Sequence, residues 1–137
     1  MTCYNSELPI GPPGPTGPQG PRGESATSAY KVYTALLSQN GSAVSPTAIE
    51  LENTLGDISF TYNDIGKYYI VSDSLFTVGK TFVIVGPLSN GLVDGFSTIA
   101  GMTASEIFLF TETTNYFPVV KSDAMLDNTA IEIRVYN

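Results

Sequence analysis

The fifteen residues from 11 to 25 read Gly-Pro-Pro-Gly-Pro-Thr-Gly-Pro-Gln-Gly-Pro-Arg-Gly-Glu-Ser. Glycine recurs at every third position of this stretch, and proline follows each of the first four glycines. Polyproline II has three residues per turn, so every third residue of three wound chains meets their common axis, where only glycine fits. The pattern therefore predicts a short triple-helical stem made of three copies of residues 11–25. Its axial residues are Gly11, Gly14, Gly17, Gly20 and Gly23.

A flexible linker is the alternative for a stretch rich in proline and glycine, but linkers seldom keep glycine in strict register. Proline presets φ for polyproline II and lowers the entropy that is lost when the chain orders. Five triplets are weak on their own, so the stem needs a trimeric neighbour that holds the three strands close together.

Residues 26–137 carry the pattern of a β-rich domain, in which short apolar segments recur between turn signals. The expected strands are 30–38, 48–55, 58–62, 67–72, 81–85, 96–100, 106–111 and 130–136. About eight short strands are typical of a β-sandwich or jelly roll. We therefore expect an all-β head of that class, trimeric like the stem before it.

Three segments carry more detailed expectations. The alternation over 48–55 favours a strand, although Ser45-Pro46 before it leaves a helix open. The continuous apolar runs at 81–85 and 106–111 are typical of strands covered on both faces. The last segment, 130–136, has its apolar residues on one face, so we expect it to lie inside a sheet.

Composition removes several classes of function. The chain has 137 residues, no histidine and a net charge of −7. That charge argues against a nucleic-acid partner, and no apolar run approaches the roughly 20 residues of a membrane helix. Without histidine, the commonest general base and metal ligand are missing, so we expect no enzyme, cofactor or metal site. The loop acids are expected to be solvated: Asp57, Asp64, Asp73, Asp94, Asp123 and Asp127.

The first ten residues, 1–10, are short and partly apolar, which favours an attachment peptide over a frayed terminus. Its candidate anchors are Cys3, Tyr4, Leu8 and Ile10. A single cysteine cannot form a disulfide within the chain, so its thiol is free or lies beside its copies in a trimer. The segment has neither the basic region nor the apolar core of a secretory signal.

A terminal peptide (1–10), a Gly-Pro-x stem (11–25) and a compact β-head (26–137) together resemble the collagen-like trimeric fibre and decoration proteins on virions of tailed bacteriophages. In the head, the segments Tyr30-Lys-Val-Tyr-Thr-Ala-Leu-Leu-Ser-Gln-Asn-Gly41, Leu51-Glu-Asn-Thr-Leu-Gly56 and Ile131-Glu-Ile-Arg-Val-Tyr-Asn137 resemble a domain of phage and prophage structural proteins. The plan is also similar to that of complement C1q and tumour-necrosis-factor-like proteins, whose heads are trimeric jelly rolls. The lone cysteine and the missing signal depart from the secreted animal members and favour assembly in a cytoplasm.

The resemblance implies a homotrimeric structural protein of the virion surface, assembled in the host cytoplasm. Residues 1–10 would bind a capsid or tail protein, and the heads would project and contact a host surface glycan. Candidate receptor contacts are the aromatic residues Tyr62, Tyr116 and Phe117. Two alternatives stay open: an inert capsid decoration protein, and an enzyme that degrades surface polysaccharide. The enzyme would use Glu50 and Glu52, which on a regular strand share one face roughly 6–7 Å apart.

Overall fold

The structure is a computed structural model that describes residues 1, 11–14, 16–17, 28–89, 94–114 and 119–137. Within these residues the protein is all-β: two antiparallel sheets and no helix. The strands are β1 (Tyr30–Ser38), β2 (Thr47–Asn53), β3 (Ile58–Asp64), β4 (Lys67–Ser72), β5 (Thr81–Val85), β6 (Leu88–Ser89), β7 (Asp94–Met102), β8 (Glu106–Thr113) and β9 (Thr129–Tyr136). The expected all-β class and the approximate number of strands are therefore confirmed.

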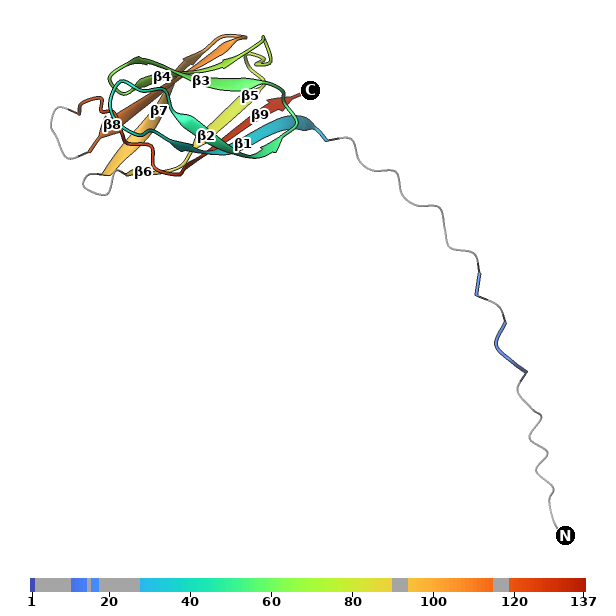
Figure 1. Ribbon diagram of the computed structural model, residues 1–137. Helices are drawn as coiled ribbons and strands as arrows, with labels where there is room; N and C mark the ends of the chain where they lie inside the picture. Colours follow the sequence, from blue (N-terminus) through green and yellow to red (C-terminus); the bar gives the residue numbers. More distant parts are fainter. Residues whose placement is uncertain (2–10, 15, 18–27, 90–93, 115–118) are drawn as a thin grey trace.

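The strands form a first sheet with the order β2-β1-β9-β5 and a second sheet with the order β3-β4-β8-β7-β6. Figure 1 shows the two sheets stacked on each other. The last strand, β9, lies between β1 and β5, which confirms that it belongs inside a sheet. Residues 47–53 form β2, so the strand interpretation of this region is correct and the helix is not formed. The chain enters the head beside its other end, where the backbone N–H of Asn137 donates to the Ala29 carbonyl.

The core lies between the two sheets, because alternate residues of each strand point inward. The first sheet supplies Tyr33, Ala35, Leu37, Ile131, Ile133 and Val135. The second sheet supplies Tyr68, Ile70, Leu88, Ile107 and Leu109. Side chains from both sheets form one cluster, so the head is a β-sandwich with a single apolar interior.

The two continuous apolar runs are covered less than their sequences suggest. In β5, Phe82 is 48% exposed and Ile84 is 47% exposed, so the expectation that both faces of this strand are covered is wrong for a single copy. In β8, one face is buried and the other is half-buried. Phe108 on that second face packs against the ring of Tyr69, at 5.3 Å between centroids.

Truncation of one buried side chain of the core is expected to destabilise the head. Ile133 is fully buried, and its replacement in Ile133→Ala is expected to lower the free energy of unfolding by about 2–5 kcal/mol. The same change at the exposed Ile65 is expected to cost less than about 0.5 kcal/mol. Urea unfolding at one protein concentration measures both values, and equal losses would contradict the placement of Ile133 in the core.

Candidate functional site

The outer face of the first sheet, which points away from the core, is an unusual surface of the head. Apolar side chains stand exposed along both of its edges. On β2, Ile49 is 61% exposed and Leu51 is 63% exposed. On β5, Phe82 and Ile84 lie opposite Arg134 and Glu132 of β9, which places them on the same face. Large apolar side chains gathered on one face are a mark of an interaction surface.

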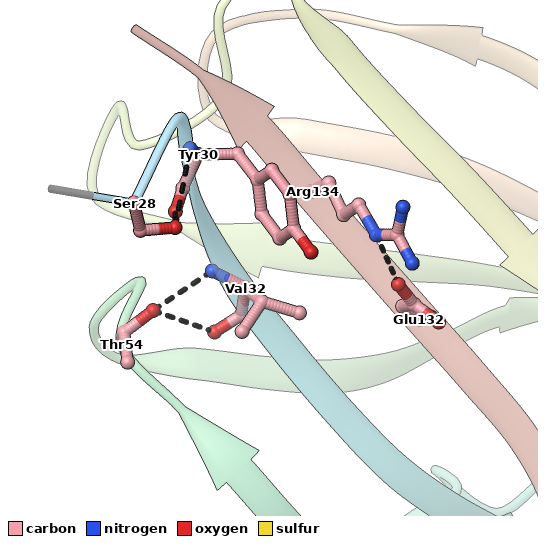
Figure 2. A network of polar contacts seen from close by, with 6 residues as sticks. All are labelled: Ser28, Tyr30, Val32, Thr54, Glu132 and Arg134. Atoms are coloured by element: carbon pink, nitrogen blue, oxygen red, sulfur yellow. Dashed lines mark hydrogen bonds and ion pairs between the residues drawn. The ribbon is translucent and has the colours of Figure 1, made fainter. Parts of the chain in front are cut away.

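A polar strip separates these two apolar edges. Glu132 and Arg134 form an ion pair along β9, and the Arg134 guanidinium lies 4.9 Å from the centroid of the Tyr30 ring. Figure 2 shows these side chains projecting from β1 and β9 toward one another. Hydrogen bonds to Tyr136 and to Glu132 raise the pKa of Arg134, so its charge is permanent. Both charges in the middle of the face are thus already partnered within one copy.

The start of β1 is tied to the loop that follows β2. The backbone N–H of Val32 donates to the Thr54 hydroxyl at 2.9 Å, and the Ser28 hydroxyl donates to the Tyr30 carbonyl at 2.6 Å (Figure 2). These bonds fix the backbone at the point where the chain enters the sheet. The direction of β1 at its first residues is therefore fixed.

An open groove of about 660 Å³ runs over this entry end of the outer face. Its charged lining residues are Lys31, Glu52, Glu132 and Arg134. Two acids and two bases leave the groove with no net formal charge, whereas the whole chain carries −7. The outer face can therefore approach a second copy without the like-charge repulsion that the rest of the molecule would feel.

The first three stem glycines are exposed, and a Cβ atom on any of them would meet nothing within 4 Å in the single chain. None of Gly11, Gly14 and Gly17 has a positive φ. Neither local space nor backbone conformation therefore explains these glycines within one copy. Gly20 and Gly23 lie outside the described residues.

Most of the other predicted site residues also fall outside the part of the chain that the structure describes: Cys3, Tyr4, Leu8, Ile10, Tyr116 and Phe117. Of the three receptor aromatics, only Tyr62 is described. It lies in β3, within the expected strand 58–62, and its ring packs edge-on against Tyr68 at 6.1 Å between centroids. Its hydroxyl donates to Asp123 at 3.3 Å. Tyr62 is thus half-buried beside the core.

Asp123 was expected to be a solvated loop acid, and that expectation is wrong. Its carboxylate accepts hydrogen bonds from the backbone N–H groups of Gly66 (2.7 Å) and Ala43 (3.1 Å). It also accepts from the hydroxyls of Tyr62 (3.3 Å) and Tyr68 (3.4 Å). One half-buried carboxylate therefore joins three separate loops and two strands at the end of the head remote from the stem.

The Tyr68 hydroxyl in this network predicts an alkaline limit to stability. Burial raises the pKa of Tyr68 to about 12, from an ordinary value near 10. The folded state thus holds this proton more tightly than the unfolded chain does, and the resulting stabilisation is complete below pH 10 and is lost as pH rises toward 12. In Tyr68→Phe, urea unfolding midpoints are expected to fall less steeply between pH 10 and 12. Equal slopes for both proteins would contradict this assignment.

The carboxylate pair of the enzyme alternative does not share a face. A register shift in the pairing of β1 with β2 places Glu52 opposite Thr34 and Glu50 opposite Ala35. Thr34 and Ala35 point to opposite sides of the sheet, and Glu52 lines the outer groove. The expected spacing on one face is therefore wrong, because the sequence does not reveal the bulge.

Searches give no relative from which a function could be transferred: no family model, curated protein or solved structure matches the chain. Among the residues that the structure describes, no group of histidine, cysteine and acidic side chains could hold a metal ion. Nor does the described part of the chain contain a helix long and apolar enough to span a membrane. The glycine period and the outer face of the first sheet are the features that bear on function.

Proposed function

We propose that this protein is a structural protein of a bacteriophage virion, a homotrimeric fibre with a collagen-like stem and three jelly-roll heads. Residues 1–10 attach it to a capsid or tail protein, and residues 11–25 wind into the triple helix. The heads project from the particle surface and contact a glycan of the host. The protein performs no chemistry, and assembly takes place in the host cytoplasm.

The glycine period is the observation that carries this proposal. Gly11, Gly14 and Gly17 have no steric or conformational reason to be glycine in a single copy. A triple helix supplies the reason, because two further chains would occupy the space beside each glycine. Five triplets need a trimeric partner domain, and the head follows directly along the chain.

The outer face of the first sheet supports the same assembly. The stem leads into β1, a central strand of that sheet. Three stems wound together bring three copies of this sheet close to one axis, where exposed apolar side chains gain by mutual burial. Ile49, Leu51, Phe82 and Ile84 are the residues that would be covered. The balanced charge of the groove removes the repulsion expected between acidic copies.

The mass of the purified full-length protein in solution tests the trimer. Static light scattering is expected to give three times the mass of the chain across a tenfold range of concentration. A monomeric or dimeric mass would remove the proposal, because three strands are a strict requirement of the stem.

Deletion of residues 1–10 tests the attachment. The shortened protein is expected to remain a soluble trimer, since the stem and head are intact, and to be missing from purified particles. Immunoblots of particles assembled with the full-length and the shortened protein make the comparison. A shortened protein that still co-purifies with particles would show that the anchor lies elsewhere.

Glycan binding by the heads is tested separately on a glycan array with the intact trimer. Binding that is lost when Tyr116→Ala and Phe117→Ala are combined would support the predicted contacts. An array without any signal would leave the protein as a decoration of the particle that binds no glycan.

A further inference from the structure

We propose that each head docks on the next through unlike surfaces: Phe82 and Ile84 of one copy enter the outer groove of its neighbour. This docking mode rests on the proposed trimer and adds the residues that meet in it. The partner is a second copy of the chain, since the stem demands three chains side by side.

Rotational symmetry decides between like and unlike contacts. Two copies related by a twofold axis present the same patch to each other, whereas a ring of three joins one patch to a different one. The first sheet offers two such patches on the same outer face. The groove lies over β1 and the end of β9, near the end of β2, and Phe82 and Ile84 stand beside it on the edge strand β5.

The groove suits an apolar guest. The Tyr30 ring and the aliphatic part of Arg134 contribute apolar surface beside the largely buried Val32, while the Arg134 guanidinium stays bonded to Glu132. A ring or branched chain laid over this ion pair does not break it, so neither charge is left without its partner. Phe82 and Ile84, each nearly half exposed in one copy, lose that exposure in the groove.

Cysteine cross-linking in the full-length trimer tests this contact. In a Cys3→Ser background, Glu52→Cys is placed at the groove and Phe82→Cys on the β5 edge. Treatment of the double variant with a short bis-maleimide is expected to give trimers on a denaturing gel. Each single variant is expected to stay monomeric on the gel, because like positions do not meet. Dimers from either single variant would overturn the unlike contact.

The matched control spans the second sheet: Ser59→Cys on β3 with Phe96→Cys on β7. Both residues are exposed, and this pair is expected to give no cross-linked product. Light scattering on the wild type and on each variant before treatment distinguishes failure of the proposed trimer from failure of the docking mode. A monomeric wild type overturns the trimer, whereas trimers without the Glu52–Phe82 product overturn the docking mode only. Should Phe82→Cys itself dissociate the trimer, Leu51→Cys with Ile84→Cys repeats the test, and the absence of product there overturns the docking mode.

Discussion

Gly17→Ala is expected to abolish the collagen-type circular dichroism signal of the full-length protein while the head stays folded. Gly17 is the third of five axial glycines, so its loss leaves only two triplets on either side. Three added methyl groups would meet at the axis, where there is room for none. In a single chain the same change is harmless, because a Cβ at position 17 meets nothing within 4 Å.

The measurement is the positive band near the polyproline II maximum, followed during heating together with the β-sheet signal of the head. Thr16→Ala is the matched control, since residue 16 is the exposed non-glycine position directly before Gly17 and does not face the axis. A Gly17→Ala protein with the wild-type band and melting curve would show that these residues are not wound together.

Ile84→Asp is expected to convert the proposed trimer into monomers. Ile84 is almost half exposed in one copy, so an aspartate there is solvated in the monomer. Glu132 of the same copy is its cross-strand neighbour on β9. In the trimer the aspartate would be buried beside this like charge and lose its contact with water. Each unpaired buried carboxylate costs about 3 kcal/mol, and three copies give about 9 kcal/mol, or roughly a million-fold in the trimer dissociation constant.

Two measurements on the full-length protein follow this change: its mass in solution and the collagen-type circular dichroism signal of its stem. Both are expected to fall together at low concentration. Ile65→Asp is the matched control: Ile65 is also exposed, but it lies in the β3–β4 turn away from the outer face. A trimeric Ile84→Asp protein would show that the interface lies on another surface.

Regular strands were well predicted from their period. The segment 30–38 is β1 residue for residue, and 130–136 lies within β9, because each alternates core and non-core side chains between clear turn signals. The order of the strands in each sheet could not be predicted from the sequence. That β9 joins β1 to β5 depends on packing between residues about a hundred positions apart.

The outer face was missed for a related reason. A continuous apolar run such as 81–85 predicts burial on both faces but does not say which molecule provides each cover. Within one copy, the core covers one side of β5 and leaves Phe82 and Ile84 exposed. In the proposed trimer, a second copy would cover this exposed side, so that both faces of β5 would be buried as the apolar run predicts.

Asp123 could not have been identified from its neighbours in sequence. Its hydrogen-bond donors come from residues 43, 62, 66 and 68, which the fold alone brings to it. An aspartate in a loop is ordinarily solvated, so the sequence predicts an exposed carboxylate here. The positive φ of Gly66 and Ala43, which marks turns that need outside support, is visible only in the structure.

The position of β9 inside the first sheet determines when that sheet can fold. On the ribosome, β1 emerges early, yet its partner along residues 30–37 is the final strand of the head. A nascent head cannot close its first sheet until β9 has emerged from the ribosome, and pairing over so long a separation in sequence is slow. In the proposed fibre, finished heads would therefore associate first, and the stem would then zip from its head-proximal triplet toward the N-terminus.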